Sequence, residues 1–118
     1  MASPNIINAS SITGKTALVN LTTASSNVLT NSSTSNTVNK LNNITLTNYS
    51  ANTIGINVII NRSSTNYYLA GNISVPSNSA LVLLAKDTQI YLEEGDVVQA
   101  FATANSAITF AASYELIA

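Results

Sequence analysis

Residues 54–61 read I-G-I-N-V-I-I-N, and this stretch decides the fold class of the chain. Apolar side chains recur at every second position, namely Ile54, Ile56, Val58 and Ile60. A period of two is typical of a β-strand, in which successive side chains point to opposite faces of the sheet. Only Ile59 interrupts the polar side of the pattern. The stretch therefore predicts a strand with one buried face.

The rest of the chain carries the same kind of pattern. Residues 108–116 repeat the alternation with Ile108, Phe110, Ala112, Tyr114 and Leu116. Further runs rich in β-branched residues, each flanked by turn formers, predict strands at Thr37–Thr47, Asn66–Ala70, Asn72–Val75, Ser79–Ala85, Gln89–Leu92 and Asp96–Thr103. Nowhere do apolar residues keep the spacing of a helix over a helix's length.

Strand signals at this density predict an all-β fold. We expect a single antiparallel β-sandwich, jelly-roll or Ig-like, of about seven to nine strands. The expected core residues are Ile56, Val58, Leu83 and Phe110. The turn formers between the strands include Asn61-Arg62-Ser63-Ser64, Ala70-Gly71-Asn72, Pro76-Ser77-Asn78, Lys86-Asp87 and Glu93-Glu94-Gly95-Asp96.

The N-terminal part of the chain has a weaker pattern. Residues 1–35 are rich in Ser, Thr and Asn, with Pro4 and Gly14 as breakers and only short apolar runs. We expect this segment to form an extended N-terminal arm or edge strands, followed by a β-sandwich domain at residues 36–118. Because its short apolar groups could dock an extended strand onto another surface, we also expect the segment to contribute to contacts with neighbouring copies.

The composition argues against several classes of function. The 118 residues include no cysteine and no histidine, which removes disulfides, Cys/His zinc sites, thiol nucleophiles and the usual general base. Five acids against four bases give a net charge of -1, so neither sign of charge attracts a nucleic acid or an anionic membrane. We therefore expect that the chain is not an enzyme and that it has no catalytic residues, no cofactor and no metal. We also expect no nucleic-acid partner and no membrane partner.

The scarcity of charge also suggests what the partners are. Charged residues make up only 8% of the chain, whereas ordinary soluble domains have about a quarter. A free monomer with so little net charge is prone to associate. A chain of this composition is easier to explain when most copies are built into an assembly, so we expect it to bind other copies of itself.

One stretch resembles a nucleotide-binding motif. Residues 9–16 read A-S-S-I-T-G-K-T, which fits a relaxed phosphate-loop pattern. The chemistry of that motif needs a helix directly after the loop, with its N-terminus pointing at the phosphates. Residues 17–23 are instead a β-type run, A-L-V-N-L-T-T. We therefore interpret the motif as a plain turn with Lys15 in solvent.

Two other clusters invite a functional interpretation. Glu93, Glu94 and Asp96 surround Gly95, but their spacing is not that of a calcium loop, and a β-turn between Leu92 and Val97 explains them. Tyr67-Tyr68 could offer a sugar-stacking platform. Because neighbouring strand residues point to opposite faces, at most one of the two tyrosines can lie on a given platform. A core or interface role for these tyrosines is the expected one.

Two stretches of the sequence carry a family resemblance. The first is Ser3–Thr16, S-P-N-I-I-N-A-S-S-I-T-G-K-T. The second runs from Val75-Pro76 through L-V-L-L and K-D-T-Q-I-Y-L-E-E-G-D to S-Y-E-L-I at residues 113–117. In order and spacing they resemble small β-rich virion structural proteins of T4-like and related marine tailed phages, especially of the cyanophage type. Together the two stretches cover a little over half of the chain.

The resemblance implies a structural subunit of a tailed bacteriophage virion, either a head decoration protein or a neck or tail accessory protein. Such a subunit acts by oligomerisation and by contacts with other virion proteins of the capsid, neck or tail. It would be made in the host cytoplasm without export, and residues 1–12 lack the basic start and apolar block of a signal peptide. The alternative is a receptor- or glycan-binding β-module of a phage fibre or cell surface.

Overall fold

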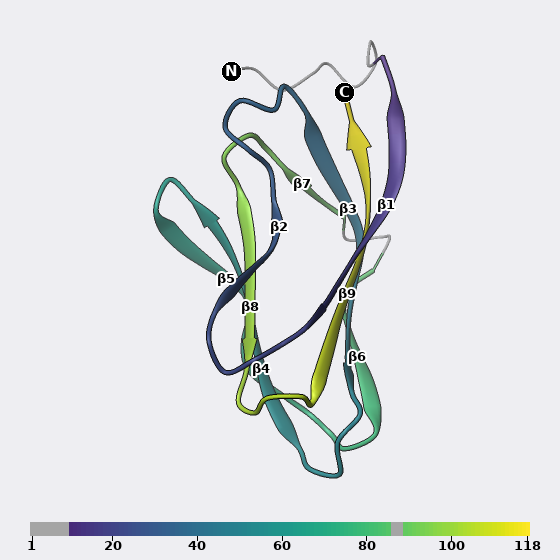
Figure 1. Ribbon diagram of the computed structural model, residues 1–118, viewed down its shortest axis with the longest axis vertical. Helices are drawn as coiled ribbons and strands as arrows, with labels where there is room; N and C mark the ends of the chain where they lie inside the picture. Colours follow the sequence, from purple (N-terminus) through teal and green to yellow (C-terminus); the bar gives the residue numbers. More distant parts are fainter. Residues whose placement is uncertain (1–9, 86–88) are drawn as a thin grey trace.

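The computed structural model describes residues 10–85 and 89–118, and these form two antiparallel β-sheets that face each other (Figure 1). The described residues contain nine strands and no helix. The prediction of an all-β sandwich is thereby confirmed. Within these residues there is no helix long and apolar enough to cross a membrane.

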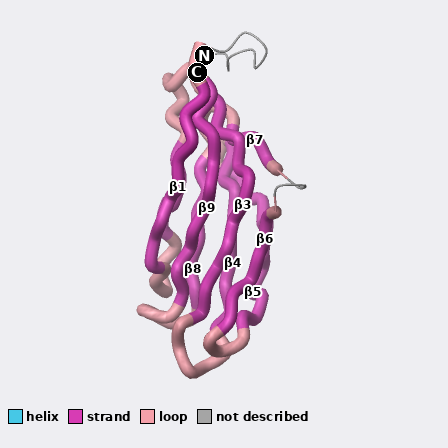
Figure 2. The backbone as a smooth tube through the Cα atoms, turned by 90° about the vertical axis from the view of Figure 1, so that its right-hand side faces the viewer, coloured by secondary structure: helices cyan, strands magenta, loops and turns pink. Residues whose placement is uncertain are grey.

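The nine strands are β1 (Ile12–Asn20), β2 (Ser26–Thr30), β3 (Val38–Asn48), β4 (Ile54–Arg62), β5 (Thr65–Val75), β6 (Ser79–Leu84), β7 (Ile90–Leu92), β8 (Val97–Ala102) and β9 (Ile108–Ile117). Sheet A has the order β1-β9-β3-β6, and β7 pairs with β3 beside β6. Sheet B has the order β2-β8-β4-β5. In Figure 2 sheet A lies toward the viewer and sheet B behind it.

The strand order is that of a jelly roll rather than an Ig-like sandwich. The pairs are nested along the chain: β1 pairs with β9, β2 with β8, β3 with β6 and β7, and β4 with β5. The chain therefore runs as one long hairpin that wraps around itself, and β9 also pairs with β3 while β8 pairs with β4. This arrangement is a double Greek key with four strand positions in each sheet, because β6 and β7 share the position beside β3.

The core lies between the two sheets. Phe110, Ile56 and Val58 have no exposed surface, as the sequence pattern predicts, whereas Leu83 is only partly buried at the edge of the core. The remaining buried apolar residues come from eight of the nine strands and from the loops after β1 and before β9. Packing between the sheets, not charge or disulfides, is therefore the main source of stability.

The segment predicted as an arm or edge strands forms edge strands where the structure describes it. β1 pairs with β9 along its whole length, and β2 pairs with β8. Leu21, Val28 and Leu29 from this segment are buried in the common core. Residues 10–35 thus belong to the sandwich, while residues 1–9 lie outside the described residues.

The turn formers have the predicted role in most places. Ser63 and Ser64 both have positive φ angles, of 53° and 64°, which makes the β4–β5 connection a two-residue hairpin turn of type I′. The prediction of separate strands around residues 70–72 was wrong, because β5 is continuous there. Its register against β4 shifts on either side of Val58, so the residues with turn character produce β-bulges instead. The predicted turn at Lys86-Asp87 falls outside the described residues.

Candidate interaction surfaces

The outer face of sheet A is a broad surface of mostly small, uncharged side chains. Strand register sets Leu18, Ala111, Thr45 and Val82 in one row across four strands. Leu18 and Val82, at the two ends of the row, are 69% and 58% exposed. Ala111 and Thr45, between them, have smaller side chains that are partly buried. The row is therefore a shallow trough between two exposed apolar side chains.

Polar side chains on this face bond to one another. The Thr109 hydroxyl donates to Oδ1 of Asn20 across 2.9 Å, and the Thr45 hydroxyl donates to Oδ1 of Asn43 across 2.8 Å. At one end, Lys40 and Glu115 form an ion pair with an N–O distance of 3.7 Å. Polar groups that already have partners lose less when water is removed from them. The face is thus chemically suited to contact with another protein surface.

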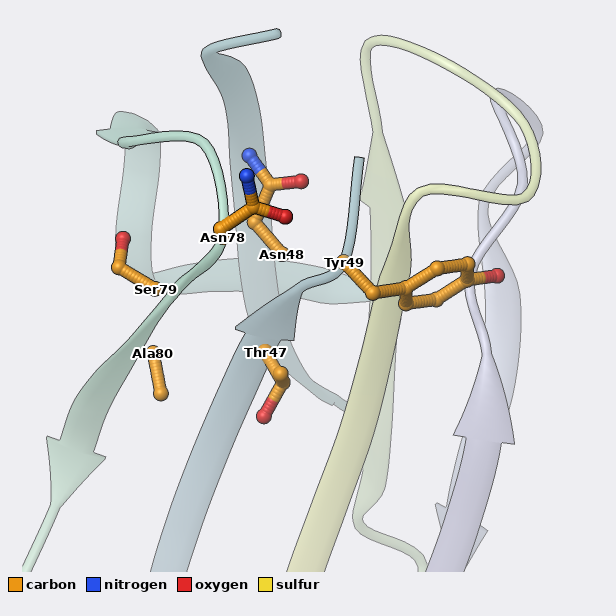
Figure 3. A pocket seen from close by; sticks show the side chains of 6 residues that line it. All are labelled: Thr47, Asn48, Tyr49, Asn78, Ser79 and Ala80. Carbon is orange, nitrogen blue, oxygen red and sulfur yellow. The ribbon is translucent and has the colours of Figure 1, made fainter. Parts of the chain in front are cut away.

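A hollow of about 380 Å³ continues this face at the end of β3 and β6 (Figure 3). Buried Asn48 organises it: its amide donates to the carbonyls of Asn52 and Val75, and its Oδ1 accepts from the backbone N–H and hydroxyl of Ser50. Figure 3 shows Tyr49 pointing away from the other labelled side chains. The hydrogen bonds of Asn48 hold the β3–β4 loop against the end of β5, so the hollow has a structural explanation.

The β4–β5 hairpin carries the second candidate surface. Tyr67 and Tyr68 are 56% and 60% exposed, so neither has the core role, and the interface role stays a prediction. In register, Tyr67 lies opposite Ile60 and Tyr68 opposite Ile59, which puts the two rings on opposite faces of the hairpin, as alternation predicts. Ile60 and Tyr67 line a hollow of about 360 Å³ together with Arg62. Both rings are therefore open to a partner.

Arg62 fixes the end of this hairpin to the turn between β7 and β8. Its Nε and Nη2 donate to the two carboxylate oxygens of Asp96 across 2.8 and 2.6 Å, and Nη2 lies 3.1 Å from the Glu93 carboxylate. Asp96 is 1% exposed and also accepts from the backbone N–H of Glu93. The Asp96 hydrogen bonds raise the pKa of the Arg62 guanidinium above its usual value, against a smaller opposing effect of burial. Arg62 is therefore a permanent cation with its charge matched locally.

The acidic cluster is thereby accounted for as a turn. Asp96 donates its backbone N–H to the Glu93 carbonyl, and Gly95 has a φ of 89°, as the β-turn prediction requires. Glu94 accepts from the backbone N–H of Asn36, while buried Asn31 donates its side-chain amide to the carbonyls of Leu92 and Thr37. Over residues 10–85 and 89–118, no group of three or more acidic side chains is arranged to hold a metal ion.

The phosphate-loop-like motif is not a loop in the part that the structure describes. Gly14, Lys15 and Thr16 lie inside β1, each paired with a residue of β9. The interpretation of the motif as a plain turn was therefore wrong: a strand, not a turn or a helix, continues through it and starts earlier than the run at residues 17–23 predicts. Lys15 is exposed.

The surfaces were only partly visible in the sequence. Its alternation predicts which residues share a face within one strand, but not that Leu18 and Val82 belong to the same row, because the two residues are 64 positions apart in the chain and their strands are connected in the sheet through β9 and β3. A scan of the sequence against protein-family models finds no matching family, and a search of curated proteins finds no matching sequence.

Proposed function

We propose that the chain is a structural subunit of a tailed bacteriophage virion, a head decoration protein or a neck or tail accessory protein. It acts by oligomerisation and by contacts with capsid, neck or tail proteins, not by chemistry. The observation that carries this proposal is the outer face of sheet A, a broad surface with exposed Leu18 and Val82, with internally bonded polar side chains and with one ion pair at its end. The sequence resemblance to small virion proteins agrees with it.

The physical setting supports the same proposal. Contacts built from Asn, Ser and Thr hydrogen bonds and small apolar side chains depend little on ionic strength, because they do not rely on charge. Jelly rolls are used by viral capsid subunits, by lectins and by cupins, so the fold is compatible with a particle subunit without requiring one. Localisation in the virion, after synthesis in the host cytoplasm without export, is part of this proposal.

Quantitative mass spectrometry of purified particles tests the proposal. We expect the chain to be present at a fixed ratio to the major capsid protein. A copy number close to that of the capsid protein would indicate head decoration, whereas one or two rings of copies would indicate the neck or tail. Absence of the chain from particles of the phage that encodes it would overturn the proposal.

The second candidate function is a receptor- or glycan-binding module, and the exposed tyrosines of the β4–β5 hairpin favour it. An aromatic ring beside a hollow that also holds Ile60 and Arg62 is a surface on which a sugar can stack. A glycan array would decide this: saturable binding to one sugar class that Tyr67→Ala removes would support the module. Tyr91→Ala is the matched control, because Tyr91 is an exposed tyrosine on the other sheet.

A further inference from the structure

We propose that two copies of the chain pair edge to edge through β1, antiparallel and around a two-fold axis at Thr16, so that two A sheets become one continuous sheet. This inference rests on the proposed function, since it names the contact by which the subunit associates. It follows from three properties of the described strands: which edges are open, which backbone groups are free, and how the sequence of β1 matches itself.

β1 is the most regular open edge of the sandwich. Its nine residues pair with β9 without any shift in register. Of the other edges, β5 has two register shifts, β2 has five residues and one shift, and β6 and β7 are short, with six and three residues. Bulges and short strands are two of the devices by which proteins prevent edges from pairing. Within the described residues, β1 lacks both devices.

The free backbone groups of β1 can be identified from its register. Ser11 and Ala118 exchange two backbone hydrogen bonds, and Leu21 donates its N–H to the Ile108 carbonyl. Because antiparallel pairs alternate between bonded and non-bonded, odd-numbered residues of β1 bond to β9 and even-numbered residues point their N–H and C=O groups away from it. These residues are Ile12, Gly14, Thr16, Leu18 and Asn20. No other described residue pairs with that side of β1.

The sequence of β1 is complementary to itself about Thr16. With Thr16 opposite Thr16 of the second copy, all nine residues overlap and every even-numbered residue faces an even-numbered one, so their backbone groups bond in pairs. Leu18 then lies beside Gly14 of the second copy. A side chain at Gly14 would have open space around it, with no other group within 4 Å, so the exposed Leu18 side chain has room there.

Charge opposes this pairing only weakly. Lys15 is the only charged residue of β1, and in the Thr16-centred register it faces Ala17 of the second copy. The two lysines approach each other only diagonally, at about 7–8 Å, where solvent screens exposed charges. Edge pairing of this length buries less area than a standard interface, so we expect a dissociation constant on the order of micromolar for the free dimer. Many copies on one particle would raise the effective strength.

Single-cysteine crosslinking tests the register, since the chain has no native cysteine. In a Thr16→Cys variant the two thiols lie on facing residues, with Cβ atoms about 5 Å apart. Ser113→Cys is the matched control: Ser113 is exposed on the same outer face and pairs with Thr16, but three strand spacings, about 14 Å, separate it from its copy. We use a bifunctional thiol reagent whose reach lies between these two distances.

We expect Thr16→Cys to give a crosslinked dimer and Ser113→Cys to remain monomeric on a denaturing gel, with both variants folded by circular dichroism. If both variants crosslink equally, or if neither does, edge pairing through β1 is wrong. Equal crosslinking at Ser113 would point to the outer face as the contact instead.

A charge substitution provides the second test, by sedimentation velocity at about 0.1 mM protein, well above the expected dissociation constant. Leu18→Lys places a cation beside Gly14 of the second copy and should weaken the dimer at least tenfold. Val82→Lys introduces the same charge at the far end of the same row, where Val82 is similarly exposed, and should leave dimerisation unchanged. Equal loss in both variants would overturn the edge contact.

The outcome separates this inference from the proposed function. If the chain is found in particles but its Thr16→Cys variant does not crosslink, the virion function is supported and the β1 contact is wrong. If the chain pairs through β1 but is absent from particles, the β1 contact is supported and the virion function is wrong.

Discussion

The two sheets end in two long edge strands that the chain treats differently. β1, at the edge of sheet A, keeps one register along nine residues. β5, at the edge of sheet B, has eleven residues but shifts register twice against β4, and Asn72 within it has a φ of 50°. The N–H of Asn72 donates to the side chain of Asn57 on the neighbouring strand β4 instead of to a backbone carbonyl of that strand. One edge is regular and the other is distorted.

This difference indicates which edge of the molecule can associate with another chain through backbone hydrogen bonds. A bulged strand with a left-handed residue cannot present an even row of donors and acceptors, so β5 is closed to pairing although its side chains Tyr67 and Tyr68 are exposed. β1 presents such a row but few large side chains. We therefore expect contacts through side chains at β5 and through the backbone at β1.

The largest expected effect comes from a substitution in the core between the two sheets, because that core supports both edge strands. Phe110 has no exposed surface, and it pairs in register with Val19 of β1 and Leu46 of β3. Phe110→Ala should lower the free energy of unfolding by about 3–5 kcal/mol, measured by denaturant titration, because it leaves a cavity between the sheets. Leu18→Ala, on the exposed side of β1, should cost less than about 0.5 kcal/mol. A cost below about 1 kcal/mol for Phe110→Ala would mean that the residue does not support the core.

The next effect is confined to the β5 side of the comparison. Arg62→Met leaves the buried Asp96 carboxylate without its cation, and we expect a loss of about 2 kcal/mol, less than for a fully buried pair because Arg62 is about half exposed. Hydrogen exchange should accelerate in β4 and β5 and stay unchanged in β1. Glu93→Gln is the control, since this exposed partner contributes less than about 0.5 kcal/mol. Equal losses in both variants would contradict the assignment of Asp96 as the main partner.

A smaller effect tests the device that distorts β5. Alanine tolerates a positive φ less well than asparagine, so Asn72→Ala should lower the free energy of unfolding by about 1 kcal/mol. Asn72→Gly should leave it nearly unchanged, because glycine adopts a positive φ without strain. Thermal unfolding of the two variants measures the difference. If alanine is tolerated as well as glycine, the left-handed conformation is not what holds the bulge.

The smallest effect concerns Lys15 on β1. Lys15→Ala should change the free energy of unfolding by less than about 0.5 kcal/mol, because the side chain is exposed. By removing the diagonal contact between two lysines it should strengthen the dimer slightly, by less than about threefold at low salt. Sedimentation at two salt concentrations measures this. A nucleotide affinity that the substitution abolished would instead revive the phosphate-loop interpretation.

The candidate surfaces were predictable only in part. Alternation correctly predicts that Tyr67 and Tyr68 point to opposite faces, but not that both are exposed, because exposure depends on β5 being an edge strand. Ile59 breaks the sequence pattern on the polar side of β4, yet it is 3% exposed, between Gln99 and Tyr68 in the sheet. Neither neighbour is near Ile59 in the chain. Asp96 and Asn31 are buried polar residues for the same reason: each meets partners from distant segments.

The sequence by itself determined that the chain folds into strands, because the period of two at residues 54–60 and 108–116 is a local property of the backbone. It also determined the placement of most turns and the absence of cysteine and histidine chemistry. Only the tertiary structure decided which strands are neighbours. Thr16 meets Ser113, and Ser113 meets Asn43, across separations that no local pattern encodes. Strand pairing is chosen by the packing of the whole core, so the open edge at β1 exists only once the jelly roll has closed.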